Sequence, residues 1–144
     1  SLYERRSTLE GLAASLAARN AGEAERAVIN DICSAEARLI QQGASPDVLA
    51  RQNRQFHHAI LQAAGNSFLA EALERLSRLM VLLGATAYSL AGRAGSIRGE
   101  HEAINRAIQA GEAVAASTAM SHHLDNALTA RLKLLSLTAG QELD

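Results

Sequence analysis

Apolar residues recur along most of the chain at intervals of three and four positions, which places them on one face of an α-helix. This pattern is interrupted mainly at glycines and at one Ser-Pro-Asp turn, where helices are expected to end or begin. It predicts helices over residues 2–20, 23–42, 46–64, 67–83, 86–90, 96–110 and 112–137, with a frayed tail to residue 144. Period-two alternation is absent, so no strand is expected. The predicted fold class is all-α, an antiparallel helical bundle of six or seven helices.

Several predicted helix ends carry residues typical of caps. Ser45 and Pro46 are expected to begin the third helix, as cap and first helical residue. Gly65 is expected to end it in the left-handed conformation that glycine adopts at little cost. Asn66 or the serine after it should cap the fourth helix, and Ser96 should cap the helix that ends near residue 110.

The composition fits one helical domain spanning residues 1–144. Of the residues, 48% are hydrophobic but only 3% are aromatic, which is typical of a bundle packed with small side chains. No apolar run approaches the roughly 20 residues that cross a bilayer, so no membrane contact is expected. The one cysteine, Cys33, excludes an internal disulfide, and we expect a small buried side chain in a cytoplasmic protein. With a net charge of -1 and scattered basic residues, the chain lacks the basic face of a DNA-binding domain.

Three histidines interrupt the apolar stripes of three different predicted helices, and Asn53 lies one turn before the first of them. The stripes are Leu49-Asn53-Phe56-His57-Ile60-Ala63, Ile97-His101-Ile104-Ile108 and Ala116-Met120-His123-Ala127. A polar side chain on a buried face needs a partner, and three imidazoles from separate helices most simply share a metal ion. The alternative is three separate core histidines, each hydrogen-bonded to a backbone carbonyl. We favour the metal site, with Asn53, His57, His101 and His123 as its side chains.

The ion is expected to be one divalent transition metal, with zinc and nickel as the first candidates because imidazole is a common ligand for both. Three imidazoles leave coordination positions open to water or an anionic ligand. The remaining histidines, His58 and His122, share faces with polar residues and are expected at the surface.

Arg6 is the other charged residue on a predicted apolar stripe, which runs through Leu2, Leu9, Ala13 and Leu16. One interpretation is structural: the side chain reaches solvent or pairs with Glu10 one turn later. The other is that its guanidinium binds the carboxylate of a small effector also held by the metal.

Enzymatic functions find little support in the sequence. No glutamate lies three residues before a histidine, as di-iron bundles require, and Gly-rich phosphate loops and nucleophile elbows are absent. Cys33 has no evident histidine partner. No carboxylate is expected on the faces that form the site, so a metallohydrolase is the weakest alternative and we expect no enzyme.

Four motifs in order resemble the FCD domain, the ligand-sensing domain of GntR-family bacterial transcription regulators. They are Arg6-Ser7-Thr8-Leu9-Glu10 in the first helix, Asn53-Arg54-Gln55-Phe56-His57 followed by Gly65-Asn66, Glu100-His101, and Met120-Ser121-His122-His123-Leu124. The resemblance implies that Asn53, His57, His101 and His123 occupy the four ligand positions of the metal-binding branch of the family. That branch usually has aspartate where this chain has Asn53, and a neutral amide leaves the charge of the ion available to an anionic effector.

The resemblance also implies the context of the domain. An effector-binding and dimerisation domain is expected to form a homodimer and to be joined to an N-terminal winged helix-turn-helix that binds operator DNA. The predicted function is thus a metal-dependent sensor of a small carboxylate, such as a lactate-like acid, a dicarboxylate or a sugar acid. The alternatives are a metal-free helical interaction domain and, less favoured, a metallohydrolase.

Overall fold

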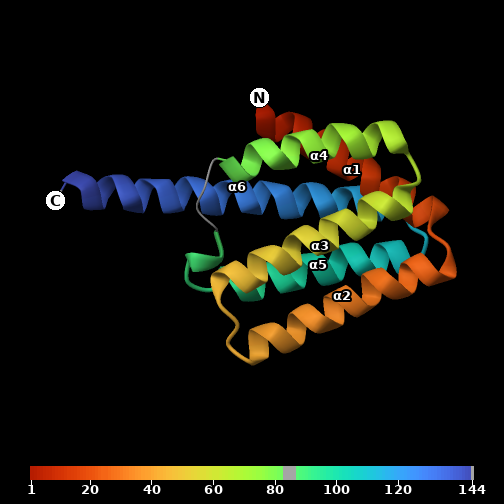
Figure 1. Cartoon of the computed structure of the whole chain (residues 1–144), viewed down its shortest axis with the longest axis horizontal. Helices are drawn as coiled ribbons and strands as arrows, with labels where there is room; N and C mark the ends of the chain where they lie inside the picture. The colour runs from red at the N-terminus through yellow and green to blue at the C-terminus, as the bar shows by residue number, and fades with distance from the viewer. Residues whose placement is uncertain (83–86, 144) are drawn as a thin grey trace.

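The computed structural model describes residues 1–82 and 87–143, and these form six α-helices and one short 3-10 helix (Figure 1). The α-helices are α1 (Leu2–Asn20), α2 (Glu23–Gln41), α3 (Pro46–Ala64), α4 (Ser67–Leu82), α5 (Arg93–Gln109) and α6 (Ala113–Leu143), and the 3-10 helix η1 is Ala87–Ser89. No strand occurs in these two ranges, which confirms the all-α bundle. The predicted ends at Leu83 and Thr86 lie outside the described residues.

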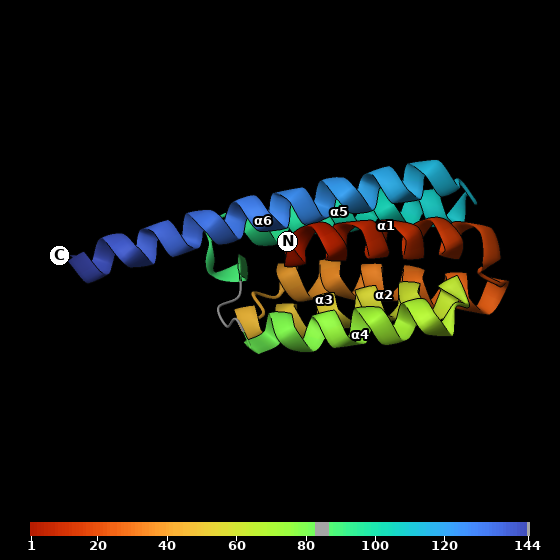
Figure 2. The same cartoon turned by 90° about the horizontal axis from the view of Figure 1, so that it is seen from above.

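Short connections fold successive helices back on one another, and α1 occupies the middle of the bundle. It packs against α3, α4, α5 and α6, while α2 covers α3 and α5 from the opposite side (Figures 1 and 2). The helix η1 contacts α3, α5 and α6. Because four later helices meet α1 at once, side chains that are distant in sequence converge at the centre.

The buried face of α1 overlaps only in part with the predicted stripe: Ala13 is common to both, but apart from Glu10 the buried residues are small. Ala13, Ala14 and Ala17 are at most 2% exposed, whereas Leu9 and Leu16 are only half-buried at the edge of the contact. Small side chains let helix axes approach closely. At Gly11 a Cβ atom would lie 3.2 Å from Oγ of Ser117 on α6, so α1 and α6 are nearly in backbone contact there. The predicted stripe was therefore right at Ala13, while Leu9 and Leu16 pack at the edge of the core and not at its centre.

The predicted caps are confirmed at both ends of α3. The Ser45 hydroxyl accepts the backbone N–H of Val48, with Pro46 in the first turn, and Gly65 ends the helix with φ of 71°. At the start of α4 the side-chain oxygen of Asn66 accepts the backbone N–H of Leu69, so the asparagine is the cap.

Two helix boundaries differ from the prediction. Ser96 does not cap α5, which begins three residues earlier at Arg93, because the Arg93 side chain is buried and bonded to Glu100 two turns further along. This ion pair within α5 connects its first turn to the rest of the helix. The helix α6 was expected to end near Leu137 and instead continues to Leu143, projecting past the other helices in both views (Figures 1 and 2). None of the described helices is long and apolar enough to cross a membrane.

The packing of α2 gives a test of the core. Ile29 is 0% exposed and Val28 beside it is 52% exposed. Removing the buried side chain leaves a cavity, so Ile29→Ala is expected to lower the free energy of unfolding by about 2–5 kcal/mol in urea titrations. Val28→Ala serves as the matched control and is expected to change it by less than about 0.5 kcal/mol. Equal effects would contradict the orientation of α2.

Candidate metal centre

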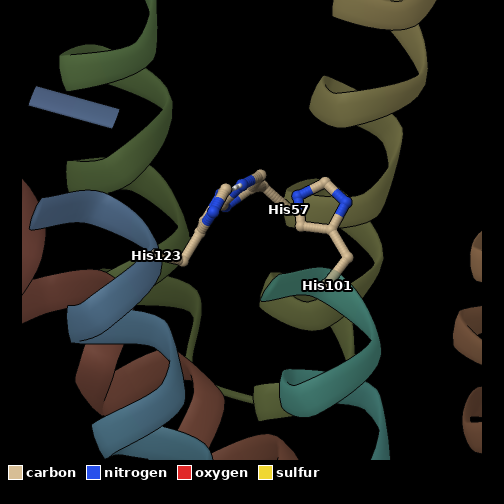
Figure 3. Close-up of side chains that lie close together, drawn as sticks. All are labelled: His57, His101 and His123. Atoms are coloured by element: carbon tan, nitrogen blue, oxygen red, sulfur yellow. Dashed lines mark hydrogen bonds between the residues drawn. The ribbon is translucent and has the colours of Figure 1, made fainter. Parts of the chain in front are cut away.

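His57 on α3, His101 on α5 and His123 on α6 bring their rings together at the centre of the bundle (Figure 3). One ring nitrogen from each lies within 4.8 Å of the other two. The Nε2 atoms of His57 and His123 are 3.3 Å apart. His101 and His123 are 1% and 3% exposed, so the cluster is almost fully removed from solvent.

The outward-facing nitrogen of each ring is bonded to a glutamate from a neighbouring helix. The Nδ1–carboxylate pairs are His57–Glu10 at 2.6 Å, His101–Glu36 at 2.9 Å and His123–Glu100 at 2.6 Å. An ionised carboxylate can only accept, so Nδ1 carries the proton and donates it. The lone pair of each Nε2 is then left free to bind a ligand at the centre of the cluster.

Two of these glutamates are held in turn by cations. Nε of Arg6 donates to Glu10 at 2.8 Å. Arg93 donates to both carboxylate oxygens of Glu100, at 2.8 and 3.0 Å, and the side-chain amide of Asn126 donates to Glu100 at 3.0 Å. Bidentate pairing of this kind fixes the orientation of the carboxylate and therefore of the imidazole that it holds.

The same contacts keep both carboxyl groups ionised inside the protein. Burial alone would raise the pKa of Glu10, but the His57 ring and the Arg6 guanidinium outweigh it and lower this pKa to about 2. Burial also opposes ionisation of Glu100, and the hydrogen bonds that it accepts, beginning with the one from His123, lower its pKa to about 2.

Burial has the opposite consequence for the imidazoles, whose charged form it destabilises. It lowers the pKa of His101 despite the opposing hydrogen bond to Glu36. In the same way it lowers the pKa of His123 to about 3 although Glu100 accepts a hydrogen bond from this ring. Both rings are neutral at physiological pH, which is the form that binds metals.

The unpaired buried atoms of the cluster and of Asn53 one turn before His57 test whether a metal ion fits. The facing Nε2 lone pairs of His57 and His123 repel each other unless a cation lies between them. Nε2 of His101 and the side-chain oxygen of Asn53 are buried and have no hydrogen-bond partner. A proton shared by two rings would still leave the other two atoms unsatisfied, whereas one metal ion can bind several donors at once. The donor set therefore fits a transition-metal ion.

The surface assignments of the other two histidines are confirmed. His58 and His122 are exposed although each is adjacent in sequence to a histidine of the cluster. Arg6 pairs with Glu10, as the structural interpretation of this residue predicted, and it also lines a pocket beside His57. Its two interpretations are therefore compatible.

The expectation that no carboxylate belongs to the site was wrong, because Glu10, Glu36 and Glu100 all reach it. For Glu36 the sequence did carry a signal, because this residue interrupts an apolar stripe between Cys33 and Ile40 just as the histidines interrupt theirs. Glu10 was identified only as a partner of Arg6. Nothing in the sequence indicated that Arg93 pairs with Glu100 two turns further along α5, or that Asn126 reaches Glu100 where α5 and α6 meet.

Cys33 is half-buried, and its Sγ lies 3.9 Å from the backbone oxygen of His101 rather than from the ring. Burial, with help from the nearby Glu36 carboxylate, raises the pKa of the thiol to about 12. The residue is thus a packing side chain and not a nucleophile.

A pocket of about 480 Å³ opens next to the cluster, between α1, α3 and α4. Its size suits a small organic ligand. Its lining combines charged residues with an apolar floor and includes Arg6, Glu10, Arg51, Asn53, Arg54, His57, Ile60, Leu61, Leu73, Glu74, Arg78 and Met120. Asn53 and His57 thus link the cluster to a space in which a ligand can bind.

Comparison with known protein families gives one result. The family model of the FCD domain matches residues 1–126, a range that includes every residue of the cluster and of its hydrogen-bond partners. The part of α6 that follows residue 126 lies outside the match. No curated protein matches the chain.

The pKa values predict how the stability of the metal-free protein depends on pH. Below pH 6.5 the unfolded chain takes up a proton at His123, whereas the folded chain takes it up only near pH 3. The melting temperature is therefore expected to fall continuously as the pH drops from 6.5 toward 3. Below pH 4.5, protonation of Glu10 and Glu100 in the unfolded chain lowers it further, since both have a folded pKa of about 2.

This dependence can be measured by thermal unfolding, followed by circular dichroism, at pH values between 8 and 3. His123→Gln is expected to reduce the slope below pH 6.5, and His122→Gln at the adjacent exposed position is expected to preserve it. A melting temperature that stays constant between pH 7 and pH 5 would contradict a neutral, buried His123.

Proposed function

The chain belongs to the FCD domain family, and from this premise we propose that it is the metal-dependent, ligand-sensing domain of a GntR-type transcription regulator. The effector is a small carboxylate that binds at the metal centre. In this proposal the domain acts as a homodimer and is joined to a winged helix-turn-helix that contacts operator DNA. The effector controls DNA binding by favouring one arrangement of the dimer over another.

The observation that carries the metal dependence is the direction of the three imidazoles. Each is held at Nδ1 by a glutamate, so His57, His101 and His123 all present Nε2 to a common point. Outer carboxylates of this kind orient metal-binding histidines and raise their basicity. If the three histidines served only for packing, the convergence of three Nε2 lone pairs on one point would be unfavourable and would have no compensating interaction.

The residues that would hold the ion are these three histidines together with Asn53. When bound, a divalent ion supplies a positive charge and open coordination positions for an anion. Because none of the four side chains is anionic, the charge of the ion remains available to a carboxylate. Zinc and nickel are the first candidates.

Arg6 supports the choice of a carboxylate effector. Only Nε of its guanidinium is used by Glu10, and the two terminal nitrogens make no hydrogen bond with the residues that the structure describes, so they remain available as donors. The side chain is 19% exposed and lines the pocket. We propose that Arg6 binds the effector carboxylate while it holds Glu10 in place.

A catalytic role receives less support. A general base must take a proton readily, but the oxygens of Glu10 and Glu100 already accept hydrogen bonds from histidines and arginines, and their pKa of about 2 makes them weak bases. The family, moreover, is one of regulatory sensor domains. We therefore propose a sensor and not an enzyme.

The metal centre is tested by two pairs of adjacent histidines. Wild-type protein is expected to bind about one zinc or nickel ion per chain and to melt at a higher temperature when loaded. His57→Ala and His123→Ala each remove a ligand and should weaken metal binding more than about tenfold, since even the loss of an outer partner costs about that much. His101→Ala should do the same. Isothermal titration with Zn²⁺ and Ni²⁺ measures the stoichiometry and the affinity, and thermal unfolding with and without metal measures the melting temperature.

The matched controls are His58→Ala and His122→Ala, which remove exposed imidazoles next to the proposed ligands. These variants are expected to keep the wild-type affinity. Circular dichroism of the metal-free variants separates loss of a ligand from loss of the fold. The proposed metal centre is wrong if folded wild-type protein takes up no metal, or if His58→Ala and His122→Ala weaken metal binding as much as His57→Ala and His123→Ala do. A metal-free interaction domain is then favoured.

Asn53 provides a second test, because Asn53→Asp adds a carboxylate with almost no change in shape. A carboxylate attracts a divalent ion more strongly than an amide oxygen does, so metal affinity should rise. The added charge also lowers the local positive potential, so the metal-loaded variant should bind acetate or lactate more weakly than the wild type. Titrations with metal first and acid second measure both changes. An unchanged metal affinity would mean that Asn53 does not contact the ion.

A further inference from the structure

We infer that the effector is a dicarboxylate, with one acid group at the metal centre and the second bound by Arg51, Arg54 and Arg78 in the same pocket. This inference rests on the proposed function, since it assumes that the pocket beside His57 is the effector site. It selects one of the three ligand classes that a metal and one arginine would accept.

The three arginines line the pocket from two helices, Arg51 and Arg54 from α3 and Arg78 from α4. On α3, Arg54 lies three residues after Arg51 and three before His57, so these residues follow one side of the helix. None of the three arginines makes a hydrogen bond or ion pair with any residue in the described ranges. All three are exposed and available to a ligand.

The charges around the pocket are unbalanced. Four arginines line it and only two glutamates oppose them. Arg6 and Glu10 are already paired with each other, so the remaining three arginines face only Glu74. Glu74 itself forms no ion pair with Arg78 one turn later on α4, within the part of the chain that the structure describes. The pocket therefore has an excess of positive charge besides the Arg6–Glu10 pair, and a second anionic group would balance it.

The floor of the pocket limits what can join the two acid groups. It is formed by the apolar side chains of Ile60, Leu61 and Leu73, which are at most 6% exposed. The lining also includes the polar side chains of Gln55 and Ser77, but hydroxyls of a sugar acid that face the apolar floor would be left without partners, which is costly. A lactate-like acid would leave the three arginines unused. In a short hydrocarbon chain with a carboxylate at each end, the hydrocarbon would contact the apolar floor. One carboxylate would bind at the metal centre and the other would bind the three arginines.

The decisive comparison is between a dicarboxylate and its monoamide, which has the same size but one charge fewer. Isothermal titration of the zinc-loaded protein would use succinate against succinamate and glutarate against glutaramate. A charge-assisted hydrogen bond is worth about one order of magnitude in affinity, so we expect at least one dicarboxylate to bind roughly tenfold more tightly than its monoamide. This advantage should shrink as NaCl is raised, since the arginines are exposed.

Variants assign the advantage to the arginines. Arg51→Gln, Arg54→Gln and Arg78→Gln are expected to reduce the affinity for the dicarboxylate several-fold and to leave that for the monoamide unchanged. Arg75→Gln is the matched control, because this residue lies on α4 three positions before Arg78 but lines a different pocket. Arg6→Gln should weaken both ligands alike, as expected for a residue at the inner acid group.

The outcomes distinguish this inference from the proposed function. If monoamides bind in a metal-dependent manner and dicarboxylates gain nothing, the second acid subsite is wrong and the metal-dependent sensor stands. If dicarboxylates bind equally well without zinc and lose affinity in the arginine variants, the subsite stands and the metal dependence is wrong. If neither ligand of any pair binds, the inference and the proposed effector site are both overturned.

Discussion

Three hydrogen bonds between buried histidines and buried glutamates connect the helices at the centre of the bundle. Glu10 joins α1 to α3, Glu36 joins α2 to α5, and Glu100 joins α5 to α6 through their respective imidazoles. A buried carboxylate is costly unless it is fully hydrogen-bonded. The structure offsets this cost with Arg6 and Arg93, so that five helices meet around one polar cluster inside an otherwise apolar core.

This arrangement determines the chemistry of the cluster before any ligand arrives. With Nδ1 of each ring occupied by a carboxylate, the tautomer is fixed and only Nε2 faces the centre. Phe56 stacks on the ring of His101 at 4.2 Å and further limits its rotation. Groups held in this way lose little conformational freedom on binding an ion, which favours affinity and a defined geometry.

The pocket beside the cluster relates ligand binding to the helix arrangement. It is lined by neutral donors from Asn53 and His57 and by unpaired arginines from α3 and α4. The helix α4 packs on α1 and α3 at the edge of the bundle. A dianion bound to Arg54 and Arg78 would link α4 to α3, and a ligand that binds one arrangement of these helices better than another shifts the population between them.

The sequence by itself determined the helices, the inward histidines and the exposed ones, because helical periodicity and capping are local properties. It identified His57, His101 and His123 as members of one cluster, and separated them correctly from His58 and His122. It did not reveal Glu36, Arg93 or Asn126 as partners of that cluster, nor that α5 begins at Arg93. Only the three-dimensional structure decided these points. The contacts of Glu36 and Asn126 depend on which helices lie side by side, and the Arg93–Glu100 pair, although it lies within α5, forms where that part of the helix is buried. A hydrogen bond between residues 65 positions apart, as between Glu36 and His101, leaves no local pattern in the chain.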